Sequence, residues 1–553
     1  MLPGGRIHEA RKREYYEKGY WTTRTVYDVF MDAVQQDPEK VAIVDVHQKV
    51  TYAQLHELVI KTSRMFVEFG IKKGDTVAVQ LPNWLEYVVF YLSSVKIGAV
   101  FCPIPITARQ HEVRYMINLC EAKLCCIPVS FRNHHFVKMY QQLKEEISLP
   151  QVIVIDKYHE VSEEQVLPAD GFVQYEPLLE QTTVDGEEIT ATISADDPLV
   201  VLFTSGTESE PKGVIHTHNT VLFGERTMRD VLKITSDDVV FMPSPLSHAT
   251  GFLHGVNLPI LVGGKMVLMD RFQAADALKM ISEEKCTFSM GATPFLHDIF
   301  KEMFNRGSLY DLSSFRFFLC GGAPIPRHIA AEATKIGFKV LAVYGSTESP
   351  PHAVSRLEDE EELIISTDGK PMPGIEVKVV DDQRQTLPVG KVGEIASRGP
   401  NVFVGYLKRP DLTERYLDED GWYYSGDYGI LNEHGYVKIV GRKKDMIIRG
   451  GQNISPGEVE QILYKHPKID KVAVVGMPDE RMGEKVCAFV VTKNGESLTL
   501  EEVVDYLAQH QIAKYKYPER LELVDELPMT ASGKIQKYLL REKLKIQLGY
   551  KTS

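Results

Sequence analysis

Short apolar runs alternate with helical patterns along most of this chain. In the first part, the runs TVAVQL, AVFCPIP and QVIVID are separated by helical segments such as WLEYVVFYLSSVKI. Strands that alternate with helices in this way form parallel sheets with helices on their faces. The pattern therefore predicts an α/β fold.

Capping residues locate some of the helix ends. Thr51 and Gln54 have the spacing of a capping box, so a helix is expected to begin just after Thr51 and to end at Gly70. Ser455-Pro456-Gly457-Glu458 has the same spacing, with proline at the first helical position. This second box predicts a helix start in the C-terminal part of the chain.

Several strands between residues 190 and 365 run into loops that are rich in glycine or hydroxyl groups. These loops are TSGTESEPKG after Phe203, GGAPIP after Cys320 and GSTES after Tyr344. Open α/β sheets bind ligands outside the carboxyl ends of their strands. The three loops together therefore indicate one ligand site.

The loop after Phe203 has the composition of a phosphate-binding loop. Hydroxyls, a glycine and Lys212 follow a buried strand, and such groups can surround an anion. Residues 206–214 do not match the Walker pattern G-x-x-x-x-G-K-[ST], so an ordinary P-loop nucleotidase is excluded. Glu208 and Glu210 lie in the same loop, although anions repel phosphate.

The length of 553 residues is enough for three or four domains of roughly 150 residues each. After residue 365 the pattern changes to short strands with glycine turns, and beyond a basic hinge to a compact α+β segment. The predicted divisions are an α/β subdomain at 1–190, a second α/β subdomain with the phosphate loop at 191–365, a small β-barrel at 366–443 and a mobile α+β domain at 444–553.

Charge and targeting signals bound the class of protein. The formal net charge of −13 argues against bulk attraction to nucleic acid or anionic lipid. The N-terminus MLPGGRIHEARKREYYEKGYW lacks the apolar core of a signal peptide, and no apolar segment reaches the roughly 18 residues of a membrane helix. We therefore expect a cytoplasmic protein without a transmembrane segment.

The cysteines agree with that location. They form no CxxC pair and have no zinc-like spacing with histidine, which is typical of reduced thiols in the cytosol. They are Cys102, Cys120, Cys125, Cys126, Cys286, Cys320 and Cys487.

Five motifs follow one another along nearly the whole chain: FTSGTESEPKGVIHTHN, YGSTES, YYSGDYG, GRKKDMIIRGGQNISPGEVE and LPMTASGKIQK. In content, order and spacing they resemble the acyl-adenylating (AMP-binding) superfamily, which contains acyl-CoA synthetases, luciferases and stand-alone adenylation domains. The chain is most similar to short- and medium-chain fatty acyl-CoA synthetases, through the further stretches SHATGFLHG, GATPF, RFFLCGG and ASRGPNVFVGY.

The resemblance implies a reaction in two steps. A carboxylate attacks the α-phosphate of MgATP to give an acyl-adenylate and pyrophosphate, and a thiol, usually that of coenzyme A, then displaces AMP. ATP, Mg²⁺ and coenzyme A are the implied cofactors. The implied fold is a large N-terminal region of two stacked α/β subdomains plus a small β-barrel, followed by a mobile small α+β C-terminal domain.

By the same resemblance, the phosphate loop wraps the β- and γ-phosphates, and Lys212 meets the terminal phosphates. This chain has Glu208-Ser209-Glu210-Pro211-Lys212 where the family has Thr-Gly-x-Pro-Lys. We expect Glu208 and Glu210 to point to solvent, and Ser209 to cost about 1 kcal/mol or more if the family's glycine uses a positive φ. The residues that wrap the phosphates are Thr204, Ser205, Gly206 and Thr207.

Other motif residues are expected to bind the nucleoside. Tyr344 would stack on adenine, Asp427 would accept both ribose hydroxyls, and Arg442 would contact the ribose. A core position at the end of a strand is the alternative for Tyr344. The remaining residues assigned to nucleotide binding are Gly321, Gly322, Ala323, Gly345 and Ser346.

Four residues are assigned to the chemistry. Thr347 would contact the α-phosphate, and Glu348 would hold Mg²⁺, a hard cation suited to carboxylate oxygens. His248 matches the family's aromatic gate before the carboxylate, with a structural histidine as the alternative. Lys534 would bridge the attacking carboxylate and the α-phosphate as a point charge, so the small domain must rotate to deliver it.

Lys444 stands at the family's hinge position. Rotation there would move Lys534 out and bring the segment IIRGGQN in. Gly450 and Gly451 would then line the pantetheine tunnel of coenzyme A, where a side chain would block the thiol. An ordinary tight turn is the alternative for this glycine pair.

The acid substrate is expected to be a short- to medium-chain fatty acid or an alicyclic acid. Residues 247–256 contain no acidic side chain that could bind an amino group, and Ala249 stands where aryl-acid activators have asparagine. Chain length stays open, because each methylene changes binding by only ~1–3 kcal/mol. The apolar residues assigned to this pocket, each of which also fits a core position, are Phe252, Leu253, Val256, Met290, Gly291, Ala292 and Phe295.

Three functions stay open on the sequence alone. The first is a CoA ligase for such acids, and the second is a stand-alone adenylating enzyme that loads a carrier-protein thiol. The third is a nucleotide- and acyl-binding protein of weak activity, which the altered loop favours and the intact catalytic motifs disfavour.

His216, His218 and His254 are interpreted as structural or surface residues. The expected partners are the acid, ATP and CoA, and the oligomeric state, including a homodimer, is left open.

Overall fold

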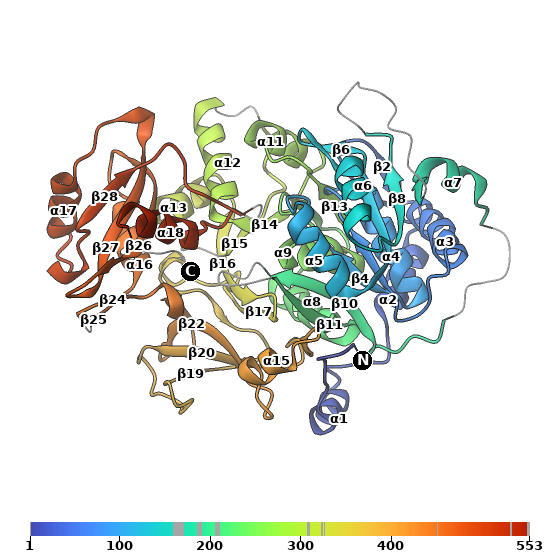
Figure 1. Cartoon of the computed structure of the whole chain (residues 1–553), viewed down its shortest axis with the longest axis horizontal. Coiled ribbons are helices and arrows are strands. Elements are labelled where there is room, and N and C mark those ends of the chain that lie inside the picture. Colours follow the sequence, from blue (N-terminus) through green and yellow to red (C-terminus); the bar gives the residue numbers. More distant parts are fainter. Residues whose placement is uncertain are drawn as a thin grey trace.

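The computed structural model of the chain describes residues 2–158, 171–184, 191–204, 211–306, 310–321, 325, 327–450, 452–530 and 533–549. Two large sheets with helices on their faces form the N-terminal region, and a four-stranded sheet lies beside them (Figure 1). A further sheet with its own helices forms the C-terminal domain. The predicted α/β fold is confirmed.

The first large sheet has eight strands in the order β21-β11-β10-β4-β3-β5-β8-β9. The strands from β10 to β9 run parallel, whereas β11 and β21 extend the sheet in antiparallel fashion. The bounds are β3 Thr76–Val79, β4 Val100–Pro103, β5 Ala122–Pro128, β8 Gln151–Ile155, β9 Phe172–Gln174, β10 Pro198–Thr204, β11 Lys212–Thr217 and β21 Gly405–Tyr406, with a small hairpin of β6 Ser130–Phe131 and β7 His134–His135 beside it.

The second large sheet has nine strands in the order β18-β17-β16-β15-β14-β12-β13-β1-β2. Its central strands run parallel, and β17, β18 and β2 are antiparallel additions at the two edges. The bounds are β1 Val41–Val44, β2 Lys49–Thr51, β12 Val239–Met242, β13 Lys265–Leu268, β14 Phe288–Ala292, β15 Phe317–Gly321, β16 Lys339–Ser346, β17 Ser349–Val354 and β18 Lys370–Pro371.

The two sheets do not follow the division expected at residue 190. Strand β10, expected in the second unit, pairs with β4 of the first sheet, and β1 and β2 belong to the second sheet. Strands that follow one another in sequence neighbour each other in space only about two-thirds of the time. One hydrophobic core cluster accordingly spans both sheets.

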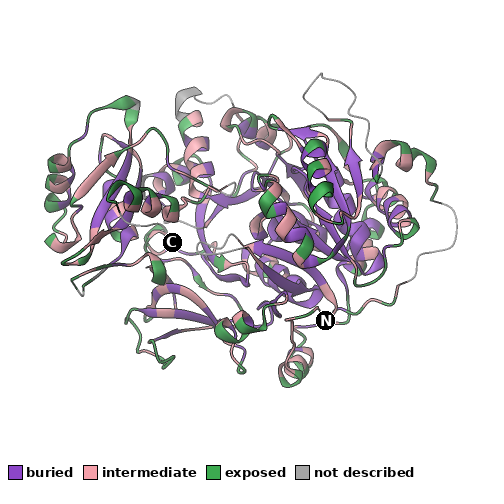
Figure 2. Ribbon diagram, in the orientation of Figure 1, coloured by how far each residue is buried: buried purple, intermediate pink, exposed green. Residues whose placement is uncertain are grey.

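Helices cover both large sheets, and α4 is buried along nearly its whole length, as the purple ribbon in Figure 2 shows. Tyr87 Oη of α4 donates to Leu246 O, and Tyr91 Oη donates to Asn257 Oδ1, so α4 links the first sheet to the second unit. The helix bounds are α1 Glu9–Glu17, α2 Val26–Gln36, α3 Tyr52–Glu68, α4 Leu85–Ile97, α5 Gln110–Cys120, α6 Phe136–Glu146, α7 Tyr175–Gln181, α8 His218–Leu232, α9 Ala249–Phe252, the π-helix η1 Leu253–Asn257, α10 Leu258–Val262, α11 Ala274–Glu283, α12 Thr293–Arg306, α13 Arg327–Lys335, α14 Glu361–Ser366 and α15 Pro410–Tyr416.

The capping box that begins α3 is confirmed. The Thr51 hydroxyl accepts from Gln54 N, and the Gln54 side chain accepts from Thr51 N. The helix ends just before Gly70, which takes a φ of +79°.

The predicted β-barrel at 366–443 is instead an open antiparallel sheet. Its order is β19-β20-β22-β23, and within this fully described segment the first and last strands do not pair with each other. Closing a barrel requires strand tilt and stagger, which four short strands cannot accumulate. The bounds are β19 Glu376–Val380, β20 Gly393–Arg398, β22 Tyr423–Leu431 and β23 Val437–Arg442.

The C-terminal domain has its own sheet and two small cores. Helix α16 begins where predicted, but the Ser455 capping box is wrong. The Ser455 hydroxyl donates to Val440 O, and Glu458 pairs with Lys516, so both side chains are used in tertiary contacts. The bounds are η2 Lys443–Asp445, β24 Ile447–Arg449, β25 Gln452–Ile454, α16 Pro456–Leu463, β26 Ile469–Asp479, β27 Gly483–Thr492, η3 Lys493–Gly495, α17 Leu500–Gln509, η4 Lys514–Lys516, β28 Arg520–Leu523 and α18 Lys537–Gln547.

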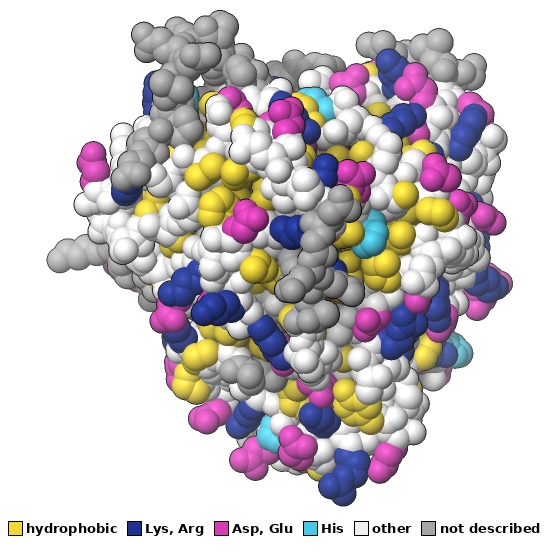
Figure 3. All heavy atoms as spheres, turned by 90° about the vertical axis from the view of Figure 1, so that its right-hand side faces the viewer, with side chains coloured by type: hydrophobic (Ala, Val, Ile, Leu, Met, Phe, Trp, Pro, Cys, Tyr) yellow, Lys and Arg dark blue, Asp and Glu magenta, His cyan; other side chains and the backbone are white. Residues whose placement is uncertain are grey.

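On the face shown in Figure 3, basic and acidic side chains are intermixed. No large field of one sign covers the described part of this face. Within the described ranges, no helix combines the length and the apolar character needed to cross a bilayer.

Candidate active site

The carboxylate of Glu348 is fixed in the turn between β16 and β17. Glu348 is 9% exposed, its Oε1 accepts from Tyr406 Oη at 2.8 Å, and its backbone oxygen accepts from Phe403 N at 2.8 Å. Burial, and then the nearby Glu348 charge, raise the pKa of Tyr406, so the phenol remains a donor. Proteins bind Mg²⁺ through one or two carboxylates plus substrate phosphates, and Glu348 fits that role.

Three of the predicted residues meet at Asp427. Tyr344 Oη donates to Asp427 Oδ2 at 2.9 Å, and Arg442 Nε lies 3.0 Å from Asp427 Oδ1. Asp427 and Arg442 face each other across β22 and β23. The Asp427 carboxylate raises the pKa of Arg442, and burial followed by the same carboxylate raises the pKa of Tyr344. The structure therefore brings these three residues together, while their contact with a nucleotide stays a prediction.

The described ends of the phosphate loop form a hairpin. Thr204 ends β10 and pairs with Lys212 at the start of β11. Lys212 Nζ lies 4.7 Å from the ring centroid of Tyr416 and 5.5 Å from that of Tyr406, which places this cation close to the Tyr406–Glu348 contact. The predicted loop residues Ser205, Gly206, Thr207, Glu208, Ser209 and Glu210 lie outside the described residues.

The remaining nucleotide residues lie at the ends of neighbouring strands. A Cβ on Gly321 would lie 2.9 Å from Val343 O, and one on Gly345 would lie 3.2 Å from Pro351 Cα, so both positions are tightly packed. Ser346 Oγ donates to Tyr423 Oη at 3.4 Å. Gly322 and Ala323 lie outside the described residues.

Lys534 comes from the C-terminal domain to this corner of the N-terminal region. A Cβ on the preceding residue, Gly533, would lie 3.5 Å from Ala292 Cβ. Lys534 is exposed to solvent. The protein around its ammonium and then the Arg442 cation lower its pKa, while Asp427 and Glu348 act in the opposite direction.

His248 lies at the same corner, as the N-cap of α9. Its Nδ1 accepts from Thr250 N at 3.3 Å. Burial, and then the charge of Lys534, lower the pKa of His248 to about 3, so the imidazole is neutral at physiological pH. Among the four residues assigned to the chemistry, His248 and Lys534 are the farthest apart in the sequence, and the charge of one acts on the pKa of the other.

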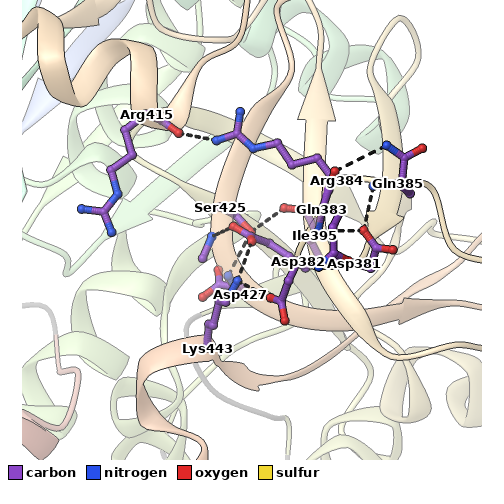
Figure 4. A network of polar contacts seen from close by, with 12 residues as sticks. Asp381, Asp382, Gln383, Arg384, Gln385, Ile395, Arg415, Ser425, Asp427 and Lys443 are labelled. Carbon is purple, nitrogen blue, oxygen red and sulfur yellow. Dashed lines mark hydrogen bonds and ion pairs between the residues drawn. The ribbon is translucent and has the colours of Figure 1, made fainter.

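The residues on both sides of the predicted hinge form ion pairs. Lys443 Nζ lies 2.8 Å from Asp382 Oδ1, in the connection between β19 and β20, as Figure 4 shows, and Asp445 Oδ1 accepts from Arg541 Nη1 of α18 at 2.7 Å. Lys444 lies between these two anchored residues, in the short helix η2. Its use as a hinge stays a prediction.

Gly450 occupies a position that favours glycine. Its φ is +56°, its N–H donates to Met482 O at 2.7 Å, and a Cβ would lie 2.5 Å from Met482 Cε. The neighbouring Gly451 lies outside the described residues. The pantetheine tunnel assigned to this pair stays a prediction.

The residues assigned to the acid pocket are all buried. Phe252 packs in the core, with its ring centroid 4.8 Å from Tyr91 and 6.0 Å from Phe101. A Cβ on Gly291 would lie 2.9 Å from Phe295 Cδ2, so glycine leaves room for that ring. The role of this set in binding an acid stays a prediction.

Two residues at the site were not found from the sequence. Tyr406 stands at the end of the matched stretch ASRGPNVFVGY, where an aromatic residue in a family-like segment is a usable signal. His216 was interpreted as structural or surface, yet its Nε2 lies 2.7 Å from Thr347 O. Nothing in the sequence around His216 indicates that contact.

Comparison with known proteins decides the class. A model of the AMP-binding enzyme family matches residues 30–407, and a model of the AMP-binding enzyme C-terminal domain matches residues 458–534. The chain belongs to the AMP-binding enzyme family. This confirms the resemblance carried by the five motifs.

Curated relatives of this AMP-binding enzyme are acyl-CoA ligases. The chain is 45% identical over 541 residues to the medium-chain fatty-acid–CoA ligase of Escherichia coli (strain K12), an alignment that covers 97% of this chain and 93% of the relative. It is 32% identical over 552 residues to the mitochondrial medium-chain acyl-CoA ligase ACSF2 of Homo sapiens, covering 96% and 89%.

Solved structures confirm the fold of this AMP-binding enzyme as a large N-terminal region with a small C-terminal domain. ATP-bound MatB from Rhodopseudomonas palustris superposes with a TM-score of 0.83 at 28% identity, over 94% of this chain and 99% of that one, and the apo form of MatB gives 0.73. The anthranilate CoA ligase AuaEII in complex with anthranoyl-AMP gives 0.86 at 24% identity, over 95% and 98%, which supports the fold alone.

Proposed function

We propose that this AMP-binding enzyme is an ATP-dependent, AMP-forming acyl-CoA synthetase that activates a medium-chain carboxylic acid and transfers it to coenzyme A. The observation that carries the proposal is that Gly533, next to Lys534, lies against Ala292 and Pro294 of the N-terminal region. At the same corner the Asp427–Arg442 pair is formed. The names of the relatives supply the class of acid and the acceptor.

In the first step, the residues at the corner would bring anions together and stabilise the charge that develops. Asp427 and Tyr344 would hold the nucleoside, and Glu348 would hold Mg²⁺, which neutralises phosphate charge when it is bound. The Lys534 ammonium would lie between the acid carboxylate and the α-phosphate. Neutral His248 adds no charge beside the carboxylate.

In the second step, the C-terminal domain would turn about Lys444 and withdraw Lys534. The better superposition on ATP-bound MatB than on apo MatB supports the interpretation that the structure represents the adenylation arrangement. The turn at Gly450 would then replace Lys534 beside the acyl-adenylate. Hinge motions of this kind need only local φ/ψ changes.

The test measures pyrophosphate, AMP and thioester formation with a panel of acids, with and without CoA. The panel includes acetate, hexanoate, octanoate, laurate and cyclohexanecarboxylate, with benzoate and an amino acid as negative controls. CoA-dependent AMP and thioester with hexanoate or octanoate is the expected result. Pyrophosphate without turnover of CoA would instead indicate loading of a carrier protein, and no product with any acid would contradict the proposal.

A further inference from the structure

His216 is a buried imidazole whose two nitrogens both have partners. It is 0% exposed on β11, with Nε2 2.7 Å from Thr347 O and Nδ1 3.0 Å from Thr220 Oγ1. A carbonyl oxygen only accepts, so Nε2 carries the proton. Burial lowers the pKa of His216 to about 4, so Nδ1 is unprotonated at neutral pH. It lies beside the Thr220 hydroxyl, whose other acceptor is Thr217 O at 3.0 Å. The ring is fixed as one neutral tautomer that donates to Thr347.

This hydrogen bond joins the two large sheets at the candidate site. His216 lies on β11, the strand of the eight-stranded sheet that begins at Lys212. Thr347 lies in the turn that follows β16 of the nine-stranded sheet. The bond therefore sets how close the lysine-bearing strand lies to the turn that contains Thr347 and Glu348.

A second side chain holds the next residue of the same turn. Tyr406, on β21, donates to Glu348 Oε1, and β21 pairs with β11 through Val214 and Tyr406. His216 and Tyr406 thus come from paired strands and bind consecutive residues, Thr347 through its backbone and Glu348 through its carboxylate. The position of the turn is therefore fixed by side chains of the eight-stranded sheet as well as by the nine-stranded sheet to which it belongs.

We propose that His216 is a positioning residue for adenylation: its Nε2–H fixes the backbone of Thr347 and thereby orients the Thr347 hydroxyl and the Glu348 carboxylate toward MgATP. The inference rests on the proposed function of this turn. A misplacement of about 1 Å in a catalytic group can cost about 100-fold in rate. Loss of one buried hydrogen bond at Thr347 is therefore expected to affect the chemistry more than the fold.

His218 provides a matched control. It is 2% exposed, burial lowers its pKa to about 4, and its Nδ1 accepts from Val26 N at 3.1 Å. Like His216, it has a ring nitrogen that is hydrogen-bonded to a backbone group, but that group belongs to α2 and not to the turn. A variant at His218 therefore reports the cost of losing a buried histidine without disturbing Thr347.

The experiment compares His216→Phe, His216→Gln, His216→Asn and His218→Phe in the full-length chain. The readouts are the Tm, the affinity for MgATP by calorimetry, the Mg²⁺ dependence of pyrophosphate release, and transfer to CoA from preformed acyl-AMP. Glutamine places an N–H near the position of Nε2, whereas asparagine is too short to reach Thr347. The glutamine and asparagine variants decide the question if His216→Phe does not fold.

We expect His216→Phe to slow pyrophosphate release by about 10- to 100-fold and to raise the Mg²⁺ concentration needed for half-maximal rate. The rate of transfer from preformed acyl-AMP stays within about twofold of that of the unsubstituted enzyme. In acyl-AMP the bond between the acid and the α-phosphate has already formed. His216→Gln recovers most of the rate and His216→Asn does not. His218→Phe lowers the Tm to a similar extent without changing the Mg²⁺ dependence.

The inference is wrong if the His216 and His218 variants show the same decrease in Tm and neither variant changes the rate of pyrophosphate release or its Mg²⁺ dependence. An equal loss in both half-reactions would also overturn it. If the unsubstituted chain binds MgATP but forms no acyl-adenylate, the proposed function fails instead. In that case the Mg²⁺-dependent ATP affinity of His216→Phe, compared with that of His218→Phe, still decides the role of His216.

Discussion

Lys534 brings a second cation into a corner that already contains Arg442. The carboxylates near it are partly used, because Asp427 pairs with Arg442 and Glu348 accepts from Tyr406. The pKa of Lys534 is lowered by its surroundings and by Arg442. Anionic substrates would therefore stabilise the charged ammonium more than the surrounding side chains do, which suits a residue that must act only when the substrates are bound.

Replacing Lys534 by alanine is expected to remove roughly 3 kcal/mol of transition-state stabilisation, a factor of about 10²–10³ in adenylation. The reason is that Lys534 is the cation assigned to bridge the carboxylate and the α-phosphate. Pyrophosphate release measures the adenylation step, and CoA transfer from preformed acyl-AMP should be spared. Lys537→Ala is the control, since Lys537 pairs with Glu460 inside the C-terminal domain. Equal losses in both half-reactions would contradict the role of Lys534.

Asp427→Asn is expected to weaken ATP binding about tenfold or more, because hydrogen bonds to charged groups contribute about 1.5–3 kcal/mol. The change also leaves the Arg442 cation without its carboxylate. The KM for ATP measures the effect. Asp382→Asn, which removes an exposed carboxylate paired with Lys443, serves as the control and should leave that KM unchanged. A KM for ATP that stays the same in Asp427→Asn would exclude the predicted ribose contact.

At the scale of residues, the motif residues could be predicted from the sequence. The side chains that hold them in position could not. Tyr344, Asp427 and Arg442 stand in recognisable motifs, and the structure brings them within hydrogen-bonding distance of one another. His216 contacts a residue 131 positions away. No local pattern encodes such a contact, because it depends on how two sheets pack. The same holds for Tyr406 and Glu348.

At the scale of elements, the sequence indicates where strands lie but not which sheet they join. The buried strand predicted before the phosphate loop is β10, yet its partner β4 belongs to the other predicted unit. An apolar strand fits either buried sheet, so pairing is decided by the whole core. Ser455 shows the same limit, since its hydroxyl donates to Val440 O rather than capping α16.

Lys444→Pro is expected to damage one half-reaction selectively. Proline locks φ near −65° and restricts the residue before it, so rotation at this position is lost while the anchored neighbours Lys443 and Asp445 remain. Separate assays of pyrophosphate release and of CoA transfer measure the two halves. Lys444→Ala, which keeps the backbone free, serves as the control. Unchanged overall turnover in the proline variant would exclude a hinge at Lys444.

For the whole molecule, buried histidines predict a loss of stability in mild acid. Burial lowers the pKa of His216 and of His218 to about 4 and that of His352 to about 3, below the usual 6.5. Between pH 6.5 and 4 the unfolded chain therefore binds protons that the folded chain does not. Each such group lowers the free energy of unfolding by up to about 1.4 kcal/mol per pH unit as the pH falls through this range.

Urea midpoints measured from pH 7.5 to 4.5 test this effect. Stability should be nearly constant above pH 6.5 as far as these groups are concerned, and should fall below it. His352→Leu should reduce the slope, since both ring nitrogens of His352 lack a hydrogen-bond partner among the described residues and leucine loses none. A midpoint that does not change between pH 6.5 and 4.5 would contradict the prediction.

The nine-stranded sheet contains strand β1 from the start of the chain and strands that are translated much later. Ile43 of β1 pairs with Met266 of β13, whereas β4 pairs with β10, which precedes β13 in the chain. A nascent chain leaving the ribosome therefore carries an apolar edge at residues 41–44 that stays uncovered until roughly half of translation is complete. Chaperone capture of early intermediates is the expected consequence for this enzyme in the cell.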